Sequence, residues 1–196
     1  MRRTSRKADV GLQLQERCRR FQNFGHRKIR VQQLFGHVLR YLPLTRLLER
    51  RFNMVDMERA HVRLQQQIDC QLEITPSAAL KTWEKAGWKD EPGTDVDEAP
   101  LKYMALVLLD AIEDRATRIA IEKDEGVTVY GDSERMLPKA PPHIIARGLE
   151  ILREISGLEG PAGQATIALG VRNDSLELII QKQAGKHMIN IPSIGV

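Results

Sequence analysis

The stretch LLDAIEDRATRIAIEKDEGVTVY, from Leu108 to Tyr130, decides the fold because its periodicity changes within a few residues. Its first part continues an almost wholly apolar run that begins near Pro100, which predicts a buried helix. Its second part alternates apolar and polar residues in RIAIEK and GVTVY, which predicts two short strands joined by a tight turn at DEG. A helix that leads directly into a hairpin is typical of an α+β domain.

The residues after Tyr130 repeat this order of a helix followed by strands. The segment PPHIIARGLEILREISGL carries apolar residues at helical spacing, and Gly157 is suited to end that helix. QATIALGV, LELIIQKQ and HMINIPS then alternate as three further strands, separated by turns at RNDS and AGK. The sequence therefore predicts an α+β domain over residues 100–196, with two helices and a small, mostly antiparallel sheet, able to fold without the residues before it.

A basic, all-helical arm is predicted before this domain, in residues 1–75. Apolar residues recur at helical spacing between Ile29 and Leu42, and Pro43 is expected to break that helix. A second short helix is expected to follow, and a third to begin at a cap near Asn53 or Asp56. Burial is expected on the third helix for Val62, Leu64, Ile68 and Leu72.

An acidic linker is predicted between the arm and the domain, in residues 76–99. The segment EKAGWKDEPGTDVDEAP contains glycine, proline and a cluster of acidic residues, which is typical of a connecting segment. Trp83 and Trp88 are expected to anchor a short helix on the domain.

The charge of the chain is unevenly distributed. The net charge is +4 overall, but between residues 1 and 51 only Asp9, Glu16 and Glu49 oppose the basic residues. Those basic residues are Arg2, Arg3, Arg6, Lys7, Arg17, Arg19, Arg20, Arg27, Lys28, Arg30, Arg40, Arg46, Arg50 and Arg51. A basic arm on an acidic body indicates an anionic partner, which the charge alone leaves open as nucleic acid, lipid headgroups or an acidic protein face.

No motif in the sequence indicates catalysis or a cofactor. The five histidines are scattered, and none stands at metal-ligand spacing from a cysteine or an acid. Cys18 and Cys70 are far apart, which favours free thiols in a reducing compartment. We therefore expect no enzyme activity, no metal and no cofactor, and a cytoplasmic location, with a peripheral position at the inner membrane face as the alternative.

The order of these segments resembles the N-terminal domain that precedes the motor core in ATPases of bacterial type II secretion and type IV pilus assembly. Asp110, Ala111 and Ile112 match a DAI corner at the end of a hydrophobic helix, and Ile119, Ile121 and Glu122 match the first strand. PPHIIARGLEILREISGL and GQATIALGVRNDSLELIIQKQ resemble the next helix and the closing hairpin. The likeness covers about residues 100–192.

The departures from that family bear on function. Arg115 stands where the family has a small glycine, so the left-handed turn there is expected to be rebuilt. Thr128 and Tyr130 stand where the family places arginines that face the nucleotide, and Arg135 is nearby but out of pattern. The sequence contains no G-x-x-x-x-G-K-[ST] loop, so it has no means of holding and cleaving a nucleotide in that way.

Together these features predict a non-catalytic adaptor that docks, through its basic arm and its α+β domain, on a hexameric secretion or pilus ATPase or on a related platform protein. The alternative is a peripheral protein that binds anionic lipid, or less favourably nucleic acid, through the arm. The residues expected to contact the partner are Arg27, Lys28, Arg30, Arg40, Arg46, Arg50 and Arg51 on the arm and Arg115 and Arg118 on the domain.

Overall fold

The computed structural model of the chain describes residues 44–89, 96–172, 174–183 and 186–192, and for residues 44–56 it describes the backbone alone. It divides the chain into one unit of residues 1–51 and a second of residues 52–196. The sequence predicts boundaries after residues 75 and 99. Nearly all of the first unit lies outside the described residues, so the fold below is that of the second.

The described helices are α2 (Leu44–Gln71), α3 (Pro76–Lys85), α4 (Glu98–Glu113) and α5 (Pro142–Ser156). The strands are β1 (Arg118–Glu122), β2 (Gly126–Tyr130), β3 (Glu134–Met136), β4 (Gly163–Val171), β5 (Asp174–Gln183) and β6 (Lys186–Asn190). This composition confirms the prediction of an α+β fold. The predicted strands and the two predicted helices of residues 100–196 are all present, and β3 is an addition.

All six strands form one antiparallel sheet in the order β3-β2-β1-β6-β5-β4. In this register Ile119 on β1 lies opposite Val129 on β2 and Ile189 on β6, so the three side chains share one face of the sheet. All three are buried. The two hairpins of the sequence, β1–β2 and β4–β5, are therefore joined by β6, which lies between them.

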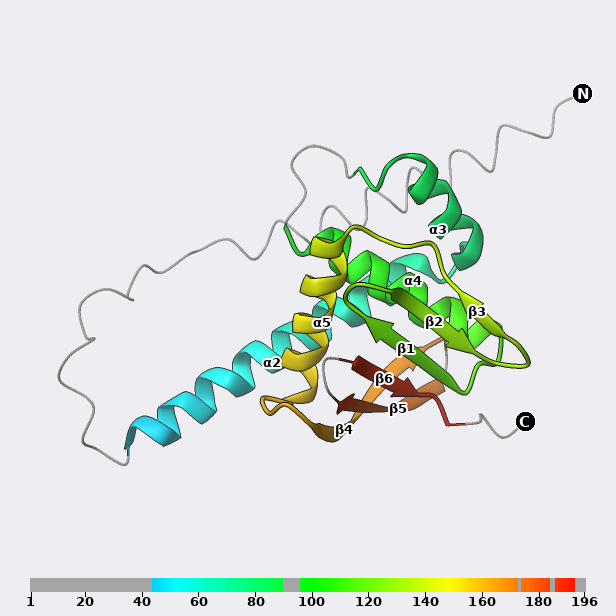
Figure 1. The fold of residues 1–196 in the computed structure, drawn as a ribbon. Helices are drawn as coiled ribbons and strands as arrows, with labels where there is room; N and C mark the ends of the chain where they lie inside the picture. The colour runs from blue at the N-terminus through cyan, green and yellow to red at the C-terminus, as the bar shows by residue number, and fades with distance from the viewer. Residues whose placement is uncertain (1–43, 90–95, 173, 184–185, 193–196) are drawn as a thin grey trace, which may run out of the picture. The chain divides into compact units, whose positions relative to one another are not determined.

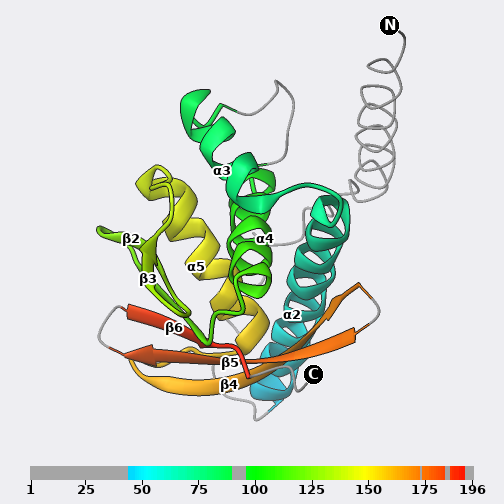
Figure 2. The same ribbon diagram turned by 90° about the vertical axis from the view of Figure 1, so that its right-hand side faces the viewer.

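Helices α4 and α5 cover this apolar face. Figure 1 shows α4 behind β1 and β2, and Figure 2 shows the helices on one side of β4, β5 and β6. Helix α4 is buried on nearly every side, as its apolar run predicted, whereas α5 buries a stripe that includes Ile144, Leu152 and Ile155. Gly157 ends α5 with φ +66°, the left-handed conformation that glycine adopts at little cost.

Helix α2 is continuous from Leu44 to Gln71, so the cap predicted at Asn53 or Asp56 does not start a separate helix. Its described side chains bury one narrow stripe, Ala60, Leu64 and Ile68, spaced four residues apart. Val62 was predicted to be buried, but it is 46% exposed. It lies two positions from both Ala60 and Leu64, and side chains two positions apart point to opposite sides of a helix.

Helix α3 occupies the first part of the segment in which the sequence predicted a linker. Trp83 on α3 is buried, and its ring lies 5.1 Å from that of Trp88, which in turn meets the edge of Tyr103 at 5.7 Å. The prediction that these tryptophans anchor a short helix is confirmed for this part of the segment. Residues 90–95, which hold much of its acidic cluster, lie outside the described residues.

Cys70 lies near the end of α2 and is disulfide-bonded in the structure, so the prediction of a free thiol is wrong at this position. Cys18 lies outside the described residues.

Candidate docking surface

The face of the sheet that points away from α4 and α5 is its most distinctive surface, and we call it the open face. No described helix packs on it. Because side chains alternate along a strand, the open face is formed by the residues between those that face α4 and α5. Its members include Arg118, Ala120 and Glu122 on β1, Thr128 and Tyr130 on β2, Met136 on β3, Ile179 and Gln181 on β5, and Lys186, Met188 and Asn190 on β6.

The centre of the open face is largely uncharged. Ala120, on the middle of β1, lies opposite Thr128 on one side and Met188 on the other. Ala120 is only 3% exposed, because its neighbours shield it, whereas Met136 on the edge strand β3 is 65% exposed. Apolar side chains on an uncovered sheet are typical of a surface that contacts another protein.

Charged side chains frame this centre at both ends of β1. At one end the guanidinium of Arg118 lies over the ring of Tyr130, with 4.3 Å between its Cζ atom and the ring centroid. Such a cation–π contact holds the arginine flat on the sheet while its charge stays accessible. At the other end Nζ of Lys186 lies 2.5 Å from Oε1 of Glu122, and this lysine holds the pKa of Glu122 below its ordinary value.

The corner between α4 and β1 holds a further exposed arginine, three residues before Arg118. Arg115 is exposed and has φ +54°, so the left-handed turn at this corner is kept rather than rebuilt, contrary to the prediction. A residue with a Cβ atom adopts this conformation at a cost of about 1 kcal/mol. The backbone around it is held by Ala116, whose N–H donates to the carbonyl of Ala111 at 2.8 Å.

Arg135 on β3 ties the same corner to the sheet. Its Nη2 atom forms ion pairs with Oδ2 of Asp114 and with Oδ2 of Asp110, the latter at 2.8 Å. Asp110 is buried. Its Oδ2 atom is close enough to Arg135 for an ion pair, but the geometry of this contact is not that of a hydrogen bond. Arg135 is thus bound within the chain, and Arg115 and Arg118 are the arginines of this region that face outward.

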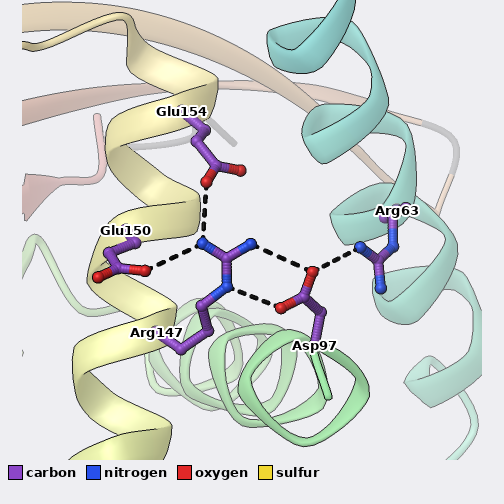
Figure 3. Close-up of polar contacts among 5 residues, drawn as sticks. All are labelled: Arg63, Asp97, Arg147, Glu150 and Glu154. Carbon is purple, nitrogen blue, oxygen red and sulfur yellow. Dashed lines mark hydrogen bonds and ion pairs between the residues drawn. The ribbon is translucent and has the colours of Figure 1, made fainter. Parts of the chain in front are cut away.

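A second group of ion pairs connects three helices (Figure 3). Arg147 on α5 donates to Asp97, just before α4, and also to Glu150 at 3.0 Å and Glu154 at 2.9 Å. Arg63 on α2 donates to the same Asp97 at 2.8 Å. The hydrogen bonds from Arg147 hold the pKa of Asp97 below its ordinary value, against the opposing effect of burial. This network joins α2, α4 and α5.

The arginines predicted to contact a partner are described only in part. Arg115 and Arg118 lie at the corner and at the adjoining end of the open face, close together in the chain. Arg46, Arg50 and Arg51 lie in the part of α2 for which only the backbone is described, and the predicted residues Arg27, Lys28, Arg30 and Arg40 lie outside the described residues. Thr128 and Tyr130, which replace the arginines of the resembled family, both lie on the open face.

Sequence reasoning did not single out His187 on β6, the one buried histidine among the described residues. Burial lowers the pKa of its imidazole, and the neighbouring charge of Lys182 acts in the same direction. The imidazole faces the core side of the sheet, beside Ile121 and Lys182 in the register. A polar residue in a strand of otherwise alternating pattern gives no signal that its side chain is buried.

Two features are absent from the residues that the structure describes. No three His, Cys, Asp or Glu side chains among them gather as metal ligands would. None of the described helices is both long enough and apolar enough to cross a bilayer. No family model, curated protein or solved structure matches the chain.

Proposed function

We propose that the chain is a non-catalytic adaptor or assembly protein that docks on a secretion- or pilus-type motor ATPase or on its platform protein. The proposal rests on the resemblance noted in the sequence, and residues 98–190 contain the helices and strands predicted there, with β3 added between β2 and α5. The observation that carries the proposal is the open face, whose uncharged centre around Ala120 and Met188 has Arg118 at one end of β1, three residues after the exposed Arg115.

An apolar centre with charges at its border is the arrangement of a specific protein interface. The centre supplies the area that is removed from water, and the charges at the border set the orientation of the partner and the rate of association. The two arginines fit a partner surface that carries carboxylates opposite Arg115 and Arg118. The strained backbone of Arg115 fits a contact residue, since strain kept at an exposed position is typical of functional sites.

The test is the binding of the purified full chain to a purified hexameric ATPase of secretion or pilus assembly from the same cell. We expect saturable binding, and no ATP hydrolysis by the chain alone. The variant Arg118→Gln with Met188→Lys should weaken binding by about tenfold or more, because it removes one border charge and places a charge in the apolar centre. Arg153→Gln, on the exposed side of α5, is the matched control for a lost arginine and should bind as the parent does.

The proposal fails if the chain does not bind such motors, or if both variants bind as tightly as the parent. Turnover of ATP by the chain alone, above that of a heat-inactivated sample, would contradict the non-catalytic part of the proposal. Circular dichroism melting of each variant separates a lost contact from a lost fold.

The excess of basic residues between residues 1 and 51 favours a second candidate function, the binding of an anionic membrane or of nucleic acid. Replacing Arg46, Arg50 and Arg51 with Gln tests it against vesicles that contain phosphatidylserine and against duplex DNA. For this function the triple variant should bind more weakly than the parent at low salt, with a flatter dependence on salt. Equal binding by the two proteins would exclude these three arginines from the contact.

A further inference from the structure

The two edges of the sheet are built in different ways. The edge strand β3 has three residues, and two of them, Glu134 and Arg135, are charged. The edge strand β4 has nine residues with the sequence GQATIALGV, and it contains no charge and no proline. Proteins normally protect a long edge strand with charges, prolines or bulges, because its free backbone groups pair readily with another strand. β4 lacks those protections.

Gly170 shows which backbone groups of β4 face outward. Its N–H donates to Oε1 of Gln65 at 2.8 Å, and its carbonyl accepts from Nε2 of Gln65 at 2.7 Å, so neither group is used by β5. His61 likewise donates from Nε2 to the carbonyl of Ala168 at 2.7 Å. Along an antiparallel edge strand, residues whose backbone groups bond the neighbouring strand alternate with residues whose backbone groups point away from it. The backbone groups of Gln164 and Thr166 therefore also point outward, away from β5.

Helix α2 therefore replaces a neighbouring strand along half of this edge. The side-chain amide of Gln65 donates one hydrogen bond to Gly170 and accepts one from it, as a peptide group of a neighbouring strand would, and it also donates to Oδ1 of Asp69 at 3.0 Å. The other half of the edge begins at Gln164, and both Gln164 and Thr166 are exposed. Within the described ranges of the chain, no group bonds the outward N–H and C=O of these two residues.

We propose that a second copy of this chain pairs with this edge, with β4 antiparallel to β4 around a two-fold axis at Ala165. In this register Gln164 lies opposite Thr166 of the second copy, and Thr166 lies opposite Gln164 of the second copy. Each pair exchanges two backbone hydrogen bonds, and the two sheets become one. A register centred closer to Gly170 would bring the second copy against His61 and Gln65. The position of α2 therefore determines where along β4 the two-fold axis lies.

The side chains at this axis fit a copy of the same strand. Gln164 and Thr166 are uncharged, so no like charges oppose each other when they meet across the axis. Ala165 meets Ala165 of the second copy and is small enough for close approach. A charged peptide would find no opposite charge on β4 itself, whereas self-pairing requires none. The pairing leaves the open face uncovered, so it does not depend on the motor as partner.

The mass of the full chain in solution, measured by analytical ultracentrifugation over a range of concentrations, tests this pairing. We expect a dimer that dissociates on dilution. Gln164→Lys with Thr166→Lys places like charges opposite each other twice and should raise the Kd by about tenfold or more. Gln164→Glu with Thr166→Lys places opposite charges at the same points and should keep the dimer. The second variant is a matched control because it changes the same two residues.

A parent chain that remains monomeric at every soluble concentration would overturn the proposal. A dimer that responds equally to the two double variants would do so as well, because the copies would then meet elsewhere. Hydrogen exchange of the parent gives a measurement that needs no variant. The amides of Gln164 and Thr166 should exchange more slowly as the protein concentration rises, while the exposed amide of Lys123 in the β1–β2 turn should not change. Unchanged exchange at Gln164 and Thr166 in a dimeric sample would also contradict it.

Discussion

Arg147 donates two hydrogen bonds to Asp97, from Nε to Oδ1 at 2.7 Å and from Nη2 to Oδ2 at 3.1 Å. This two-point contact joins α5 to the residue that precedes α4, and planar pairs of this kind are the stronger charge-assisted hydrogen bonds. Its side chains are only partly exposed, at 32% for Arg147 and 14% for Asp97. The contact therefore contributes more than an ordinary surface ion pair.

The variant Asp97→Asn should be less stable than the parent at neutral pH, by about 1–2 kcal/mol. The folded state lowers the pKa of Asp97, so the carboxylate stabilises the fold fully at pH values above 3.8, the ordinary value. That stabilisation is lost as the pH falls through the lower pKa of the folded state. Urea unfolding of both proteins measures the difference between their free energies of unfolding. This difference should therefore be constant near neutrality and narrow below about pH 4. A difference in free energy of unfolding that grows on acidification would contradict the stabilising role of the Asp97 carboxylate.

The variant Arg135→Met should destabilise the fold by about 2 kcal/mol, because it leaves the buried carboxylate of Asp110 without its cation. The cost is below that of a fully buried pair, since Arg135 is 33% exposed. In the double variant Arg135→Met with Asp110→Asn, most of the stability should return. Thermal melting of the parent, both single variants and the double variant gives the interaction free energy between Arg135 and Asp110. Additive losses would show that the two residues do not act as a pair.

The variant Arg115→Gly should raise stability by roughly 0.5–1 kcal/mol, because glycine adopts φ +54° without the penalty of a Cβ atom. Arg118→Gly is the contrasting control. Residue 118 begins β1 in an extended conformation, so glycine there should lower stability. The midpoints of urea unfolding compare the two variants. If Arg115→Gly is the less stable of the two, the arginine side chain contributes more to the fold than its backbone costs.

A fragment that begins at Phe52 should melt cooperatively, and one that begins at residue 100 should be much less stable. The shorter fragment lacks Leu64, Ile68, Leu80 and Trp83, which belong to the core. Each large apolar side chain removed from a core costs about 1.5–3 kcal/mol. Calorimetry of both fragments measures the difference. Equal melting temperatures would support the domain of residues 100–196 that the sequence predicted.

The local elements of the domain could be read from the sequence, because each leaves a periodic pattern. The alternation in RIAIEK and GVTVY predicted β1 and β2, and the apolar run before Asp110 predicted α4. Strand β3 was not predicted, since three residues are too few to show alternation. Without β3, the ion pair between Arg135 and Asp110 could not be foreseen.

The contacts that organise the edge of the sheet could not be read from the sequence. Gln65 and Gly170 are separated by 105 residues, and neither belongs to a motif. A glutamine on a helix ordinarily faces water, and only the packing of α2 beside β4 gives it a backbone partner. The open face was equally hidden, since alternation shows that a strand has two faces but not that a helix covers only one of them.

The position of β6 has a consequence for synthesis. This strand lies in the middle of the sheet, yet the five other strands that the structure describes all precede it in the chain. As the chain leaves the ribosome, the hairpins β1–β2 and β4–β5 are complete before β6 emerges, but nothing yet joins them. Among the described strands, β6 is translated last, and it unites the two halves. Until then each half carries an unpaired edge, so this is the stage at which a nascent chain most needs protection from aggregation.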